Sequence, residues 1–111
     1  MTAANVAFRA MHRRLGFTEA GATQMVNTEG INTMRALRGL KPNKVKLICK
    51  QMRSPGGDEP GIVVSAGAEI NLTTAARVAH DWWRMSRPYD AGDVQLDPSD
   101  LFDDGSFRVH L

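Results

Sequence analysis

The positions of helix-breaking residues most constrain the fold of this chain. Gly16, Gly30, Gly39 and the loop-forming stretch 54–61 separate segments in which apolar residues recur every three or four positions. That spacing places apolar side chains on one face of a helix, where they can pack against a core. The sequence therefore predicts an all-α fold of about five helices, the last of which is the longest.

The first two helices are bounded by residues that cap or end helices. Asn5 can cap a helix over residues 5–15, which Gly16 would end. Thr18 can cap a second helix that runs toward Gly30, and Glu19 in its first turn suits the positive end of the helix dipole. The sequence thus predicts two short helices joined by a tight turn.

A third and a fourth helix are expected on either side of Gly39. Asn32 can cap a helix over residues 33–38, and Pro42 can open the next one, because its missing N–H breaks no helical hydrogen bond there. The inward stripe of this fourth helix would be Val45, Ile48, Cys49 and Met52. Its adjacent outward face would carry Lys46, Lys50 and Arg53.

The longest helix is predicted after the loop. Ser65 can cap it, and it should run to about Ser86 before Pro88 stops it. Its buried seam would consist of Leu72, Ala75, Ala79 and Trp82. We expect Ile48 and Met52 to pack against this seam. Trp82 fits the seam, whereas Trp83, about 100° around the helix, should face a second neighbour or a partner; core packing is the favoured role for both.

Composition favours a single domain inside the cell. The chain has 111 residues, 42% of them apolar, which is enough for one modest core. A lone cysteine cannot form an internal disulfide, and we see no signal-peptide pattern or membrane-spanning apolar run, so an intracellular location is expected. We divide the chain into a helical interaction domain, 1–88, and an acidic C-terminal tail, 89–111.

Charge is segregated between the two halves of the chain. Residues 1–56 carry ten Lys or Arg and two acids, whereas residues 57–111 carry four Arg and ten acids. One acid-free run is the candidate surface for a partner or a nucleic acid: Arg35, Arg38, Lys41, Lys44, Lys46, Lys50 and Arg53. The candidate acidic interaction surface lies in the tail: Asp93, Asp97, Asp100, Asp103 and Asp104.

The first half of the chain resembles sterile-alpha-motif domains and related helix-hairpin-helix units. The resemblance rests on Leu15-Gly16-Phe17, the turn 30–34, Leu37, Leu40 and the segment 45–50. It implies a bundle of short helices followed by a longer one. The run 37–42 is similar to the hairpin whose paired glycines bring backbone N–H groups against a phosphate, although Lys41 stands where the second glycine would be.

A second resemblance extends over residues 15–98. Ile48-Cys49, Met52-Arg53, Pro55-Gly56-Gly57, Val64-Ser65, Ala68-Glu69, Asn71-Leu72 and the segment 84–88 occur in an order similar to the N-terminal domain of gag-like open reading frames of algal retroelements. This resemblance implies a non-enzymatic protein of a mobile or viral element that self-associates and packages nucleic acid. It supplies no catalytic residues.

No pattern in the sequence indicates catalysis, a cofactor or a metal. Cys49, His80 and Asp81 could be imagined as a nucleophile, base and orienting group, but Cys49 belongs to an apolar stripe, where a free cysteine behaves as an inert hydrophobe. The histidines are scattered without zinc-like spacing, and the acids of the tail lack a calcium-loop pattern. We therefore predict a non-enzymatic protein with no cofactor and no metal.

Two functions fit these observations. The first is an assembly module that associates with itself or with another protein through complementary basic and acidic surfaces. The alternative is a non-specific nucleic-acid-binding domain that uses the basic helix 41–53 to contact DNA or RNA phosphates. The basic run contains no aromatic residue, so base stacking has no platform there.

Overall fold

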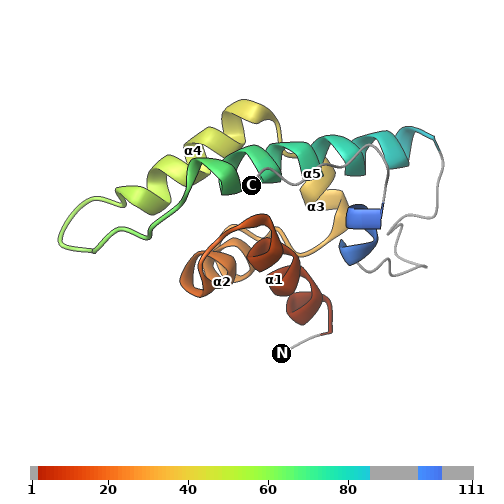
Figure 1. Ribbon diagram of the computed structural model, residues 1–111. Coiled ribbons are helices and arrows are strands. Elements are labelled where there is room, and N and C mark those ends of the chain that lie inside the picture. The colour runs from red at the N-terminus through yellow and green to blue at the C-terminus, as the bar shows by residue number, and fades with distance from the viewer. Residues whose placement is uncertain (1–2, 86–97, 104–111) are drawn as a thin grey trace.

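The computed structural model describes residues 3–85 and 98–103 of the chain, apart from the side chains of Asp100 and Asp103. Within these ranges the fold is all-α, as predicted, and contains no strand (Figure 1). Five α-helices and one 3-10 helix follow one another: α1 (Ala3–Leu15), α2 (Glu19–Asn27), α3 (Met34–Arg38), α4 (Pro42–Arg53), α5 (Ala66–Arg84) and η1 (Pro98–Asp103).

Side-chain caps begin several of the helices as the sequence predicted. The hydroxyl of Thr18 accepts a hydrogen bond from the Gly21 N–H at 3.1 Å, and that of Ser65 accepts one from the Ala68 N–H at 3.1 Å. Pro42 opens α4. These bonds satisfy N–H groups that have no partner within the first turn of a helix.

Two predicted caps were wrong, and both involve asparagine. α1 begins at Ala3, so Asn5 lies inside it, and α3 is capped by the hydroxyl of Thr33, which accepts from the Ala36 N–H at 3.0 Å. The side chains of Asn5 and Asn32 instead bond to each other, with Nδ2 of Asn32 donating to Oδ1 of Asn5 at 2.8 Å. This bond ties α1 to the connection between α2 and α3.

α5 is the central helix of the fold. It packs against α1, α3, α4 and η1, while α1 and α2 pack against each other on one side of it (Figure 1). The predicted seam of Leu72, Ala75, Ala79 and Trp82 is buried, together with further small residues of the same helix. Because alanine has a short side chain, neighbouring helices can approach α5 closely.

Gly16 shows how close this approach is. Its φ of +115° ends α1 in a conformation that side-chain-bearing residues rarely adopt. A β-carbon at this position would lie 3.5 Å from the β-carbon of Ala68, in van der Waals contact with it. The turn after α1 therefore lies close against the start of α5. The glycine therefore serves both the turn and the packing.

Polar side chains reach across the core to carbonyl groups at the ends of segments. Nδ2 of the buried Asn71 donates to the carbonyl of Leu15 at 2.8 Å, which satisfies an acceptor in the last turn of α1. Nε2 of the fully buried His12 donates to the carbonyl of Ile31 at 3.0 Å, and its ring meets that of Phe17 edge-on. These bonds fix α1 against α5 and against the turn that follows α2.

Part of the acidic tail is anchored to the helical domain. Leu101 of η1 is fully buried, and η1 packs against α1 and α5. The guanidinium of Arg14 lies 4.0 Å from the centre of the Phe102 ring, in cation–π geometry. The side of the molecule on which η1 sits is therefore fixed by apolar burial.

Burial of α4 against α5 should be essential for stability. Ile48 and Met52 are buried in one core cluster with Leu72, Ala79 and Trp82. We expect Ile48→Ala to lower the free energy of unfolding by about 2–5 kcal/mol, because it leaves a cavity. Leu47→Ala on the same helix is the matched control, since Leu47 is 45% exposed and should change stability little. Urea denaturation of both variants decides the prediction, and equal stabilities would contradict it.

The buried imidazole of His12 should make the fold sensitive to acid. Burial lowers the pKa of His12 from 6.5 to about 4, against the opposing effect of its bond to the Ile31 carbonyl. As the pH falls from 6.5 to 4, the unfolded chain takes up a proton that the folded chain does not, so stability is lost over this window. At 1.36 kcal/mol for each pKa unit, the loss is about 3 kcal/mol.

Unfolding measured at several pH values tests this effect. The difference in stability between wild type and His12→Gln should shrink as the pH falls from 6.5 to 4, whereas His80→Gln should follow wild type because His80 is only half-buried. If wild type and His12→Gln change in parallel over this window, His12 is not the source of acid sensitivity.

Candidate anion-binding surface

The lysines of α4 point outward because of where its apolar residues lie. Val45, Ile48, Cys49 and Met52 are buried, as predicted, so the remaining positions of the helix face solvent. Lys44, Lys46 and Lys50 are exposed, and so are Lys41 just before the helix and Arg35 on α3. We call these five residues the basic face: Arg35, Lys41, Lys44, Lys46 and Lys50.

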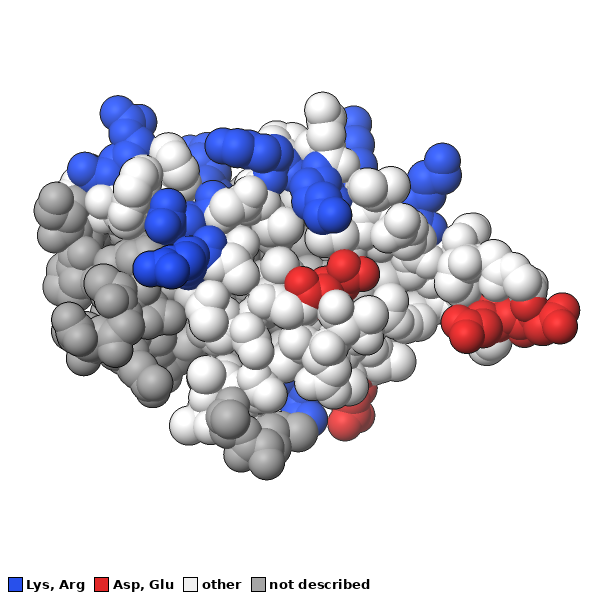
Figure 2. Space-filling model, turned by 180° about the vertical axis from the view of Figure 1, so that it is seen from behind, with Lys and Arg blue, Asp and Glu red and all other residues white. Residues whose placement is uncertain are grey.

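Acidic side chains lie away from this face. Figure 2 shows Lys and Arg gathered along the edge of the molecule that α4 forms, while the acidic side chains of that view lie elsewhere. Asp58 and Glu59 are exposed in the loop beyond the end of α4. Within the described part of the chain, the one ion pair joins Arg53 to Glu69, so no carboxylate neutralises the basic face. Its positive potential is therefore available to an anion.

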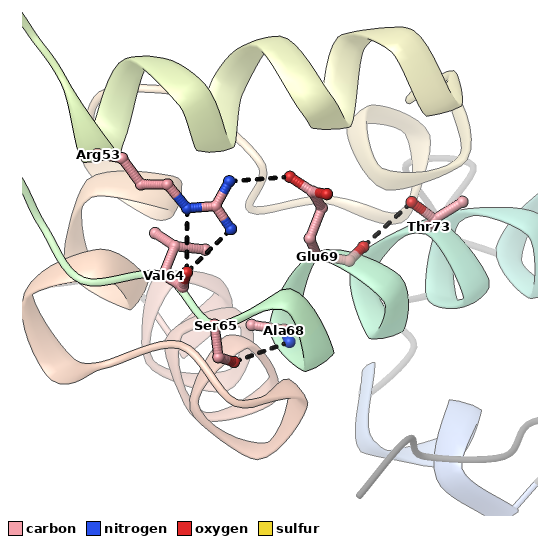
Figure 3. A network of polar contacts seen from close by, with 6 residues as sticks. All are labelled: Arg53, Val64, Ser65, Ala68, Glu69 and Thr73. Atoms are coloured by element: carbon pink, nitrogen blue, oxygen red, sulfur yellow. Dashed lines mark hydrogen bonds and ion pairs between the residues drawn. The ribbon is translucent and has the colours of Figure 1, made fainter.

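Arg53 belongs to the predicted run, but it is turned toward its own chain. Its Nε and one terminal nitrogen donate to the carbonyl of Val64 at 3.0 and 2.9 Å, and the other terminal nitrogen meets Glu69 at 3.3 Å (Figure 3). The N–H of Ile62 also donates to the carbonyl of Met52 at 2.7 Å. These bonds close the loop 54–61 and fasten the end of α4 to the start of α5. Arg53 is exposed like Lys46 and Lys50, but its guanidinium is engaged within its own chain.

Gly61 allows the loop to close in this way. A β-carbon on Gly61 would lie 2.8 Å from the carbonyl carbon of Arg53 and still nearer to its oxygen. Any side chain at this position would push the segment that leads from the loop to α5 away from the end of α4.

Arg38 is also engaged within the chain. It is half-buried at the end of α3, and its guanidinium lies 4.2 Å from the centre of the Trp83 ring. Trp83 is 46% exposed, so the expectation that it packs in the core was wrong, while Trp82 is buried as predicted. The two tryptophans differ because successive helical residues point about 100° apart.

A pocket of about 230 Å³ lies beside the basic face, between the junction of α3 with α4 and the middle of α5. Its basic or ionisable lining residues are Arg38, Lys41, Arg77 and His80, and the other described lining residues are Leu40, Pro42, Thr73 and Ala76. Arg77 and His80 were not predicted as part of an anion-binding surface. Their spacing from Thr73 places them on one face of α5, but nothing in the sequence indicates that this face meets Lys41.

The predicted acidic surface is described only in part. Asp100 and Asp103 belong to η1, which packs against α1 and α5. Asp93, Asp97 and Asp104 lie outside the described residues. The structure therefore locates the backbone of one part of this surface and leaves the remainder as a prediction.

Cys49 is poorly suited to nucleophilic chemistry. Its side chain is fully buried, and burial, with the negative charge of Glu69, raises the pKa of the thiol to about 11. The thiol is therefore protonated at neutral pH, whereas a cysteine nucleophile requires the thiolate. Among the described residues, no group of three or more His, Cys, Asp or Glu is arranged to hold a metal ion.

Comparison with known proteins finds no matching family model, no similar curated protein and no similar solved structure. None of the helices in the described ranges has the length and apolar character needed to cross a membrane.

Proposed function

We propose that this chain is a non-enzymatic assembly module that associates with itself or another protein inside the cell, through complementary basic and acidic surfaces. The observation that carries the proposal is the separation of the basic face from η1. The basic face lies on α3 and α4, whereas η1, with Asp100 and Asp103, packs against α1 and α5 (Figure 1). The backbone of η1 thus packs against helices other than α4, which carries most of the basic face.

The anchoring of η1 favours contact between chains over contact within one chain. Leu101 is fully buried and Phe102 lies against Arg14, so moving η1 onto α4 would expose apolar surface. Docking of η1 on the basic face of a second copy needs no such change. A head-to-tail contact of this kind uses two different patches and can extend into a filament. The sequence resemblance to sterile-alpha-motif domains, whose polymers typically use head-to-tail contacts, supports the same proposal.

Charge reversal on α4 tests this contact. Lys46→Glu with Lys50→Glu should convert oligomers into monomers, because like charges would then face each other across the interface. The measurement is size-exclusion chromatography with light scattering over a range of protein concentrations, at low and high salt. Arg84→Glu reverses an exposed cation outside the basic face and should leave the mass distribution unchanged.

Complementation identifies the acidic partner of the basic face. A variant with Asp100, Asp103 and Asp104 changed to Lys should not self-associate, but it should assemble when mixed with the Lys46→Glu/Lys50→Glu variant. A wild-type protein that stays monomeric at high concentration and low salt would refute self-assembly. If each variant assembles as well as wild type, association does not use these charges.

Nucleic-acid binding is the second candidate, favoured by the exposure of all four lysines between Lys41 and Lys50. The basic face contains no aromatic residue, so its contacts would go to phosphates and would not read sequence. Such binding should weaken steeply with salt, with a slope of about −0.9 for each neutralised phosphate on duplex DNA.

Fluorescence anisotropy with two labelled duplexes of unrelated sequence tests this candidate. We expect equal affinities for the two duplexes, loss of binding in Lys46→Glu/Lys50→Glu, and retention of binding in Arg84→Glu. Far-ultraviolet circular dichroism should show unchanged helicity in both variants. An absence of wild-type binding at about 50 mM salt, where screening is weak, would exclude this function.

A further inference from the structure

We propose that the pocket between the α3–α4 junction and α5 binds a phosphate monoester dianion. This site goes beyond the assembly surface, because two of its four basic or ionisable lining residues, Arg77 and His80, come from α5 and lie outside the basic run. Arg38 and Lys41 complete the charged lining. Two segments distant in sequence, residues 38–42 and 73–80, thus place positive or ionisable groups around one cavity.

The charge of the lining selects the class of ligand. Arg38, Lys41 and Arg77 are basic side chains, and among the described residues no Asp or Glu lines the pocket. A carboxylate or a phosphodiester brings one negative charge, whereas a phosphate monoester brings about −1.5 to −2 at pH 7 and three acceptor oxygens. The monoester therefore offsets more of the repulsion among the three cations, and arginine can bind its oxygens in bidentate geometry.

One indole ring holds two of the lining residues in place. The guanidinium of Arg38 lies 4.2 Å from the centre of the Trp83 ring, and the centre of the His80 ring lies 5.7 Å from it. Stacking on an indole ring restricts the side chain of Arg38. Part of the entropic cost of ordering the site is thus met before a ligand arrives.

Helix geometry and size agree with a small anion. Pro42, the first residue of α4, borders the pocket, so the positive end of that helix dipole adds to the field of the cations. The volume of about 230 Å³ is below the roughly 300–1,000 Å³ typical of sites for larger organic ligands. The pocket suits a phosphate with at most a small attached group.

Titration of the full chain with small anions tests the proposal. The probes are inorganic phosphate, O-phosphoserine, diethyl phosphate and acetate, followed by isothermal titration calorimetry at pH 8 and low ionic strength. We expect inorganic phosphate and O-phosphoserine to bind at least tenfold more tightly than diethyl phosphate and acetate. Tighter binding of O-phosphoserine than of inorganic phosphate would support a ligand with an attached group, and equal binding would support recognition of the phosphate alone.

Matched variants locate the binding site. Arg77→Gln and Lys41→Gln should each weaken phosphate binding by about tenfold, the effect of losing one charge-assisted hydrogen bond. Arg84→Gln on α5 and Lys44→Gln on α4 remove exposed cations that do not line the pocket, and they should stay within about twofold of wild type. The imidazole resonances of His80 should shift on addition of phosphate, and those of His12 should not.

Two results would overturn the proposal. One is an absence of both heat and His80 shifts at millimolar phosphate. The other is equal binding of acetate and phosphate together with equal weakening by Arg77→Gln and Arg84→Gln, which would show only diffuse attraction to a basic protein. The comparison of Arg77→Gln with Arg84→Gln separates this site from the assembly surface, because neither residue belongs to the basic face.

Discussion

Burial of α5 is the constraint on which the rest of this structure depends. The helix contacts α1, α3, α4 and η1, and its buried side chains include four alanines: Ala68, Ala75, Ala76 and Ala79. Short side chains let several helices approach one axis, and each approach removes apolar surface from water on both partners. A larger residue at any of these alanines would have to displace a neighbouring helix, since protein cores are packed as densely as crystals.

The same burial explains how a strongly basic helix remains folded. Lys46 and Lys50 lie four residues apart on α4, where like charges destabilise a helix by roughly 0.2–0.5 kcal/mol. The buried stripe on the opposite side of α4 contributes considerably more, because each fully buried apolar side chain is worth about 1.5–3 kcal/mol. The fold can therefore tolerate concentrated positive charge on its surface, and an anionic partner would relieve the repulsion that remains.

Local sequence patterns predicted the helices well because helix caps and helical periodicity depend only on residues close together in the sequence. Thr18, Ser65 and Pro42 act within a few residues of their own positions, and the stripe Val45–Ile48–Cys49–Met52 follows from helical periodicity. Contacts between distant segments could not be predicted in this way. The hydrogen bond from Asn71 to the Leu15 carbonyl joins residues 56 positions apart. Arg77 and Lys41 line the same pocket only because of how α5 packs beside the start of α4. Periodicity assigns a residue to a face, but it does not identify the neighbour that this face meets.

Sequence periodicity also did not predict which residues of the basic run contact their own chain and which remain exposed. The seven cations of this run look equivalent in sequence, yet Arg38 and Arg53 are held against α5, one by Trp83 and the other by Val64 and Glu69. Both are arginines, whose planar guanidinium can stack on an indole or donate to two acceptors at once. Between them lie only lysines, whose flexible ammonium groups gain little from such fixed contacts and remain exposed. The stretch from Arg38 to Arg53 is thus held at both of its ends by contacts with α5 and with Val64, which lies just before that helix, and the lysines between them share one solvent-facing edge.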